Sequence, residues 1–381
     1  MRRAWLLVVS LLIIPSAQEA DAAPTLKTIK PGSTCSKLNQ IQIINSWRFT
    51  CVKSGKKLIW NKGIAIKPPS KSSQIVNNFI DQYADVQVTW DNLNDQKDLL
   101  VLKNWANWQK AQTRQKKTLI KREILYSPNV VVRDIEPNKV FDNLEKIFSW
   151  VNLPDQYRVL YFGIKDEEWA KNKYKELYSS KNEVNFAACR KTFCIGGNVG
   201  REPQQMIHMN ISRDYELAPA GLLSNSDPEG GLEAHEFIHV IQFGYAKGYR
   251  DLAVPAWITE GGATFFSTLA LAKDLDSYRY MRYRSSQSYR YAPENIEKHV
   301  LDLFNGSPDS PFSANYTLGY FVTEVLTGMY GIDGTFRLIE NTSNLATFEE
   351  AFKVTFGEDW LTVKPRLVSA VKHQILLPRG F

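Results

Sequence analysis

The sequence predicts an α+β fold, in which a small mixed sheet packs on a central helix and a mainly helical part follows. Short β-prone runs alternate with helical patterns in the middle of the chain, and helical patterns dominate after residue 230. Near the N-terminus, β-prone runs and two cysteines indicate a separate hairpin module held by a disulfide. Alternating strands and helices followed by helices alone are typical of a mixed α+β domain.

The composition indicates a folded protein that has no nucleic-acid partner. The chain has 381 residues, of which 44% are hydrophobic, and this fraction is enough to build a core. Its formal net charge is +7, and we interpret the charge as spread over the chain without a dense basic block or an aromatic-basic motif. Nucleic-acid binding needs such a cluster. A mildly basic exported protein instead favours acidic substrates or anionic polymers of the cell envelope.

Residues 1–22 have the pattern of a secretory signal peptide. Arg2 and Arg3 precede an apolar run from Trp5 to Ile14, and Ala20-Asp21-Ala22 is a small-x-small cleavage site. The apolar run is about half of the roughly 20 residues that a bilayer-spanning helix needs. We therefore expect a secreted, extracellular protein, and the alternative is an uncleaved N-terminal anchor.

Four cysteines in an exported chain predict two disulfides. Three pairings are possible, and proximity in the sequence favours Cys35–Cys51 and Cys189–Cys194. The cysteines are poor candidates for zinc ligands because the chain has no C-x-x-C pair.

Residues 31–63 are predicted to form the small β module, with a hairpin around Ser54-Gly55. Its run TCVKSGKKLIWNKG resembles a small module of exported actinobacterial proteins, a resemblance that implies no activity. We expect a spacer, and attachment to the cell envelope is the alternative. Residues 64–72 follow as a linker, which consecutive prolines make stiff.

Residues 73–200 are predicted to be the N-terminal α/β part of the main domain, and they are long enough to contain a propeptide. A helical pattern runs from Ser73 to about Lys121, and we expect its Trp105 and Trp108 to be core residues rather than a carbohydrate platform. Four β-prone runs are predicted to be strands, at residues 129–132, 158–162, 184–188 and 205–209. One further helix is predicted at residues 166–177.

The chemistry concentrates in residues 201–381, where His235-Glu236-Phe237-Ile238-His239 forms an H-E-x-x-H pattern. Residues four apart share one face of a helix, so both histidines can bind one metal ion while Glu236 activates a water molecule. The alternative is an ordinary amphipathic helix with solvated polar residues. Because the whole chain has only five histidines, two at this spacing favour the metal site.

Glu260 is the predicted third metal ligand, carried by a second helix that Pro255 opens. Two histidines and one glutamate leave the fourth tetrahedral position of Zn²⁺ open, as in catalytic zinc sites. The small residues at 261–263 allow that helix to approach another closely. His208 is expected to be a structural histidine of a strand rather than a fourth ligand.

The segments HEFIHVIQFG, PAWITEGGATFF and NYTLGYFVTEVL together resemble the gluzincin metallopeptidases over about residues 200–360. The similarity is greatest to bacterial families with a peptidase-MA-like domain, and the zinc aminopeptidases are more distant. The resemblance implies a zincin-like domain that hydrolyses peptide bonds, with Zn²⁺ held by His235, His239 and Glu260 and with Glu236 as general base. Tyr316 and Gly319 match a Y-x-x-G motif whose phenol hydrogen-bonds the oxyanion, although Tyr316 could equally be a core aromatic and Tyr320 is a rival.

Two departures from the aminopeptidase pattern favour an endopeptidase that acts on peptide or protein substrates. The chain has no G-x-M-E-N segment, which holds the free amine of the substrate in that family, and Thr259 replaces the usual asparagine. An aminopeptidase, another zinc hydrolase, or a non-catalytic envelope-binding protein with a retained zinc site are the alternatives. Neither substrate preference nor oligomeric state can be predicted from the sequence.

Overall fold

We describe the fold from a computed structural model of the chain. The described residues are 30–36, 38, 41–44, 47–65, 79–114, 116, 120–130, 132, 135–177, 195–201, 207–213, 230–246 and 254–380. The predicted signal peptide, most of the predicted linker, the run at 184–188, and Cys189 and Cys194 all lie outside these residues.

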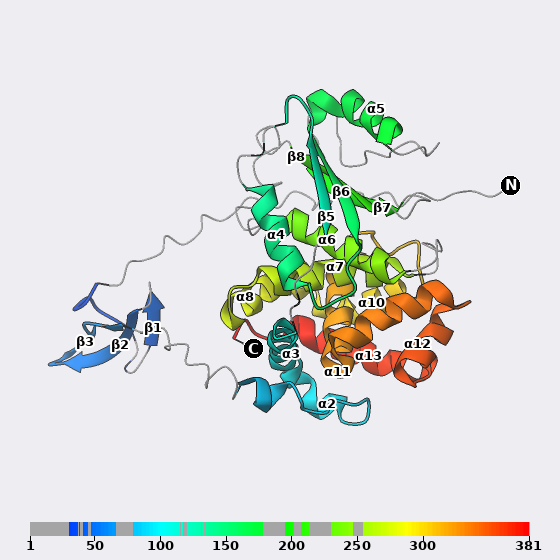
Figure 1. Ribbon diagram of the computed structural model, residues 1–381. Coiled ribbons are helices and arrows are strands. Elements are labelled where there is room, and N and C mark those ends of the chain that lie inside the picture. The colour runs from blue at the N-terminus through cyan, green and yellow to red at the C-terminus, as the bar shows by residue number, and fades with distance from the viewer. Residues whose placement is uncertain are drawn as a thin grey trace. The chain divides into compact units, whose positions relative to one another are not determined.

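The chain divides into two compact units, Ile13–Asn78 and a larger one formed mainly by Phe79–Phe381. In the smaller unit, hereafter the N-terminal module, strand β2 pairs antiparallel with three others (Figure 1). The strands are β1 (Ile41–Ile44), β2 (Trp47–Ser54), β3 (Lys57–Trp60) and β4 (Ile64–Ala65). The predicted hairpin turn is confirmed at Gly55, whose φ of 61° is left-handed, and so is the Cys35–Cys51 disulfide.

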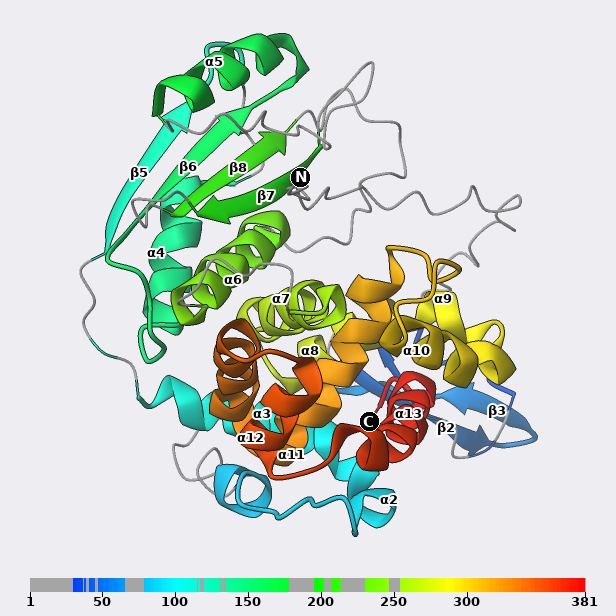
Figure 2. The ribbon, with the colours of Figure 1, turned by 90° about the vertical axis from the view of Figure 1, so that its right-hand side faces the viewer.

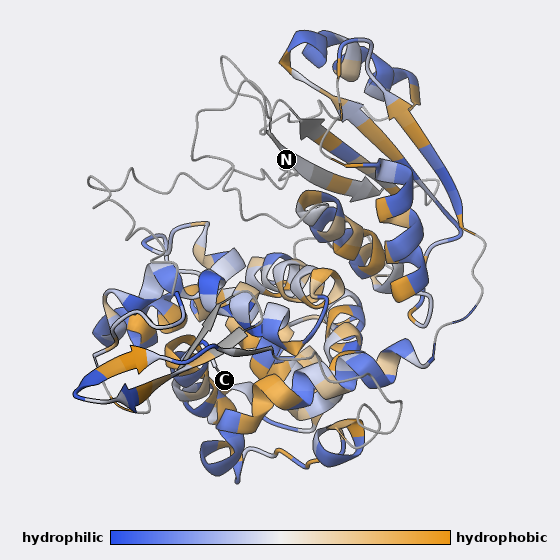
Figure 3. Ribbon diagram, turned by 90° about the vertical axis from the view of Figure 1, so that its left-hand side faces the viewer, coloured by the Kyte–Doolittle hydropathy of each residue, from blue (hydrophilic) through white to orange (hydrophobic). Residues whose placement is uncertain are grey.

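The larger unit contains a four-stranded mixed sheet in the order β5-β6-β8-β7. The first three strands in this order are parallel, and β7 pairs antiparallel with β8 at one edge. Their bounds are β5 Lys121–Tyr126, β6 Gln156–Phe162, β7 Ile195–Arg201 and β8 Ile207–Arg213. The strand predicted at 158–162 is confirmed, and so is the helix predicted at 166–177, which is α5 (Glu167–Leu177) and carries mostly hydrophilic residues (Figure 3).

The strand predicted at residues 129–132 is wrong, because the chain turns there and the strand lies earlier, in β5. The turn forms around the buried Asp166. Its carboxylate accepts hydrogen bonds from the Ser127 hydroxyl at 2.7 Å and from the backbone N–H of Asn129 at 2.9 Å. The charged start of β5 hides its strand character, since Glu123 faces solvent in an ion pair with Arg158.

One face of the sheet is covered by α6 (Gly231–Tyr245) and α4 (Pro137–Ile147), as Figure 2 shows. Helix α6 packs against β7 and β8 on one side and against α7 (Ala256–Leu271) on the other. Beyond α7 lies α11 (Ala314–Asn344), a long helix that is kinked at Gly331. The predicted α+β architecture is therefore confirmed, with a small mixed sheet packed on the H-E-x-x-H helix.

The remaining helices complete the larger unit, and those that follow α7 make the C-terminal part mainly helical. They are α2 (Leu93–Gln96), α3 (Leu100–Gln112), α8 (Leu275–Ser285), α9 (Gln287–Arg290), α10 (Ile296–Phe304), α12 (Phe348–Phe356) and α13 (Trp360–Leu376). Trp105 and Trp108 of α3 are buried, as predicted for core residues. In the described part of the chain, we find no helix of the length and apolarity that a membrane span requires.

Helices α7 and α11 touch through glycines at their crossing. A Cβ atom added to Gly261 would lie 2.1 Å from the carbonyl carbon of Gly319, and one added to Gly319 would lie 2.3 Å from the carbonyl oxygen of Trp257. Real Cβ contacts are never this short. The crossing therefore needs glycine at both positions, and it fixes the distance between Glu260 on α7 and Tyr316 on α11.

Candidate metal centre

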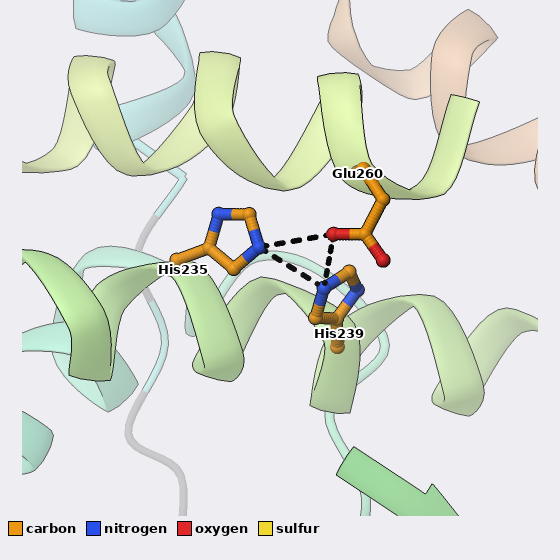
Figure 4. Close-up of side chains that lie close together, drawn as sticks. All are labelled: His235, His239 and Glu260. Atoms are coloured by element: carbon orange, nitrogen blue, oxygen red, sulfur yellow. Dashed lines mark hydrogen bonds and ion pairs between the residues drawn. The ribbon is translucent and has the colours of Figure 1, made fainter. Parts of the chain in front are cut away.

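Three side chains from α6 and α7 converge on one point between the helices (Figure 4). His235 and His239 lie one turn apart on α6, and Glu260 reaches them from α7. The Nε2 atoms of the two histidines are 3.2 Å apart, and the Oε2 atom of Glu260 is 3.2 Å from His235 and 3.4 Å from His239. The three residues form a group that could hold a metal ion.

The electrostatics of this group favour a cation at its centre. Burial lowers the pKa of the His239 imidazole, but the facing carboxylate of Glu260 outweighs burial and raises this pKa to about 9. Burial raises the pKa of the Glu260 carboxyl, but His239 and His235 outweigh it and hold the pKa well below its usual range. A metal ion that binds His239 must replace the proton that this raised pKa favours, so binding releases a proton.

Gln242 fixes the orientation of His239. Its Nε2 amide group donates a hydrogen bond to the Thr259 carbonyl oxygen at 2.9 Å, and its Oε1 atom lies 2.7 Å from Nδ1 of His239. Because the carbonyl can only accept, the amide nitrogen must face Thr259, and the amide oxygen must then accept a hydrogen bond from the Nδ1–H group of His239. In the neutral imidazole, the Nε2 atom of His239 is then free of a proton and can bind a metal. Gln242 thus acts as the hydrogen-bond partner that orients a metal-binding histidine.

Glu236 lies beside the group but does not belong to it. Its side chain is buried, and its Oε2 atom has no hydrogen-bond partner among the described residues. Burial raises the pKa of this carboxyl above its ordinary value, although the charges of His235 and His239 oppose the shift. A buried carboxylate oxygen without a partner is rare in folded proteins and commonly marks a functional position.

The edge strand β7 runs directly over Glu236. A Cβ atom added to Gly197 would lie 2.6 Å from the Oε1 atom of Glu236, so only glycine leaves room for the carboxylate there. No local sequence pattern indicates this role of Gly197, because Glu236 is 39 positions away in the sequence.

Tyr316 stands in the first turn of α11, where its ring stacks on His235 with the centroids 5.6 Å apart. Burial and then the charge of Glu260 raise the pKa of the phenol, which therefore stays protonated and able to donate a hydrogen bond. The rival, Tyr320, is fully buried among core aromatics, 5.4 Å from the ring of Phe265. Of the two tyrosines, Tyr316 is the one that contacts the candidate metal group.

The structure brings together the three predicted metal ligands and places Glu236 and Tyr316 next to them. The backbone of His208 lies in β8, and its side chain is outside the described residues. Gln242 was missed by the sequence analysis, although its position three residues after His239 places it on the same helix face and could have indicated it.

Comparisons with protein-family models, with curated proteins and with solved structures find no match to this chain.

Proposed function

We propose that the chain is an exported, zinc-dependent endopeptidase. The observation that carries the proposal is the size of the triangle formed by the three donor atoms, whose edges are 3.2, 3.2 and 3.4 Å. Zn²⁺ binds nitrogen and carboxylate oxygen at about 2.0–2.1 Å in a tetrahedron, for which adjacent donors lie about 3.3 Å apart. The triangle therefore has the dimensions of one face of a tetrahedral zinc site.

A catalytic rather than a structural role is favoured by the residues around this triangle. His235, His239 and Glu260 supply three ligands, and three protein ligands with one open position are typical of catalytic zinc. Structural sites are usually closed by four ligands. Among the described side chains beside the group, Glu236 and Tyr316 are of the kinds that hydrolysis requires, a general base and a hydrogen-bond donor for the oxyanion.

When bound, zinc supplies a Lewis acid that lowers the pKa of water toward about 7 and polarises a carbonyl group. In the proposed reaction, the carboxylate of Glu236 accepts a proton from the attacking water and passes it to the leaving amine. The phenol of Tyr316 donates a hydrogen bond to the oxyanion of the tetrahedral intermediate. Gln242 keeps His239 in the tautomer that leaves Nε2 available.

Export is supported by two further observations. The chain carries the Cys35–Cys51 disulfide, a bond that is typical of oxidising compartments, and its first 22 residues have the pattern of a signal peptide. Endopeptidase action is favoured over aminopeptidase action because the G-x-M-E-N segment that would bind a free amine is absent from the sequence.

The proposal is tested by comparing the wild type with Glu236→Gln on an unfolded protein substrate. We expect the wild type to cleave it and a chelator to stop the cleavage. Glu236→Gln should retain its zinc but lose about 10²–10⁴-fold in rate, which is the usual contribution of general base catalysis. Tyr316→Phe should lose about 10²–10³-fold, the usual effect of removing one oxyanion donor.

A peptide with a blocked N-terminus distinguishes the two kinds of peptidase. Equal cleavage of blocked and free peptides supports the endopeptidase, whereas cleavage of the free peptide alone would identify an aminopeptidase. Near-normal turnover by Glu236→Gln would refute the general-base role. Zinc binding without cleavage of any peptide would instead favour a non-catalytic zinc protein.

A further inference from the structure

The positive charge of the chain is concentrated in and around the N-terminal module. Between Ala23 and Ile80 the sequence has ten Lys and Arg residues and no Asp or Glu. Residues 81–381 contain 35 Lys and Arg against 38 Asp and Glu. The interpretation that the charge is spread over the whole chain is therefore wrong, because the larger unit is slightly acidic and the excess of positive charge belongs to the module and its flanks.

The lysines whose side chains are described in the module are all exposed. They are Lys30, Lys53, Lys56, Lys57 and Lys62. The hydrophobic residues Phe49, Cys51 and Trp60 form the small core of the module. The module thus exposes lysines around a core that the disulfide also holds, with Lys53 and Lys57 on opposite faces of the ribbon.

The exposed lysines follow the length of the β2–β3 ribbon. Lys53 and Lys57 flank the hairpin turn, which contains Lys56. Lys62 lies beyond the other end of β3, about 16 Å from Lys57 if the chain rises 3.3 Å per residue. The Gly32 amide donates a hydrogen bond to the Trp60 carbonyl oxygen at 2.8 Å, which brings the segment of Lys30 to the Lys62 end.

This row of charges has no counterpart within the module. Since residues 23–80 contain no acidic side chain, none of these lysines can form an ion pair there. Like charges that are not neutralised repel each other and disfavour a compact fold, so a surface of this kind needs another reason to exist. A row of cations binds a polyanion well, because each contact releases counterions from the polymer.

We propose that the N-terminal module binds a linear polyanion outside the cell, a polymer with repeated phosphate or carboxylate groups, through the exposed lysines of its β2–β3 ribbon. A lipid surface is less well suited, because the aromatic residues Phe49 and Trp60 are buried in the core. Among the described side chains of the module, Leu38 is the one large hydrophobic residue that is exposed. The proposal does not depend on the metal centre, which belongs to the other unit.

The test uses the chain from Ala23 to Phe381 and two variants with the same change in charge. One variant replaces Lys53, Lys56, Lys57 and Lys62 by glutamine, and the control replaces four exposed lysines of the larger unit by glutamine. The control positions are Lys116, Lys121, Lys146 and Lys353. Binding to inorganic polyphosphate and to polyglutamate is measured by fluorescence anisotropy at several salt concentrations.

We expect the wild type to bind at least one polymer, with the logarithm of its Kd rising by about 3 per tenfold increase in salt if four or five contacts form, at about 0.7 per contact. The module variant should bind at least tenfold more weakly at 0.1 M salt, with a slope of about 0.7 or less because only Lys30 of the row remains, whereas the control variant should stay within about twofold of the wild type. Zinc content and melting temperature should be the same in all three proteins.

Three results would overturn the proposal. Equal losses in both variants would show that only the total charge matters, and no loss in either would show that the ribbon is not the binding surface. Tighter binding to vesicles with 30% anionic lipid, or to single-stranded DNA, than to both polymers would identify a different class of partner.

Discussion

Replacing Gln242 by methionine should weaken zinc binding without unfolding the protein. Methionine has a similar length and volume, but it can neither accept the hydrogen bond from Nδ1–H of His239 nor donate one to the Thr259 carbonyl oxygen. In the structure these two contacts measure 2.7 and 2.9 Å, and Gln242 is only 4% exposed, so water cannot easily replace them. His239 would then be free to rotate or to change its tautomer.

The expected size of the effect follows from these contacts. Loss of an outer hydrogen-bond partner typically lowers metal affinity by 10–100-fold, or about 1.4–2.7 kcal/mol. Two lost hydrogen bonds of about 0.5–1.5 kcal/mol each, with a carbonyl left unpaired, should also lower the stability of the metal-free protein by about 2 kcal/mol. Gln242→Glu should retain zinc affinity because it keeps an acceptor for Nδ1, but it should also lower stability because its second oxygen would face the Thr259 carbonyl oxygen.

The assay is a titration of metal-free protein with zinc against a competing chelator, with circular dichroism as a check on folding. We expect Gln242→Met to raise the Kd at least tenfold and Gln242→Glu to stay within about threefold of the wild type. Gln87→Met, at an exposed glutamine, is the matched control and should have no effect. An unchanged Kd in Gln242→Met would refute the orienting role, and equal losses in both Gln242 variants would show that the effect is one of packing.

Three further predictions concern stability. Gly261→Ala should lower the free energy of unfolding by about 1–3 kcal/mol and should also lower zinc affinity, because its Cβ would meet Gly319 at 2.1 Å. Gly380→Ala, whose Cβ would have no atom within 4 Å, should change neither quantity in denaturation and zinc titrations. Arg282→Met should lower the free energy of unfolding by about 3–5 kcal/mol, because it leaves Glu324 buried without its 2.7 Å ion pair. Lys298→Met, which breaks the surface pair with Asp302, should lower it by less than about 1 kcal/mol in the same measurement. Burial raises the pKa of Asp166, but hydrogen bonds from Ser127 and Asn129 outweigh burial and lower it below its ordinary value, so its carboxylate stabilises the fold above the pKa of the unfolded chain. The difference in unfolding free energy between wild type and Asp166→Asn should therefore be full at pH 7 and shrink as the pH falls below about 4, and a difference that grows in acid would contradict this.

The metal ligands could be predicted because their spacing on a helix is a local property of the sequence. His235 and His239 are one turn apart in any α-helix, so the sequence alone places them on one face. Glu260 could be predicted from its position on the next helix, and the structure brings its carboxylate within 3.4 Å of both histidines. The disulfide between Cys35 and Cys51 was also predictable, because a short loop favours pairing of neighbours in the sequence.

What could not be predicted depends on contacts between distant residues. Gly197 lies over Glu236 only because β7 joins the sheet at the edge next to α6, and no local pattern indicates this. The β5 strand was not predicted because Lys121, Arg122 and Glu123 resemble the charged end of a helix. In the fold these residues lie in the sheet, where Arg122 pairs with Glu145 of α4 and Glu123 pairs with Arg158 of β6. The basic surface of the N-terminal module was overlooked for another reason: the net charge of the whole chain conceals two units of opposite sign.

The central claim is that His235, His239 and Glu260 hold one zinc ion, and metal analysis combined with X-ray absorption tests it most directly. We predict one zinc per chain in the wild type and in Glu236→Gln, coordinated by nitrogen and oxygen at about 2.0–2.2 Å, and loss of this zinc in His239→Ala. A protein that takes up no zinc after reconstitution, or zinc bound by sulfur in the wild type, would contradict the claim.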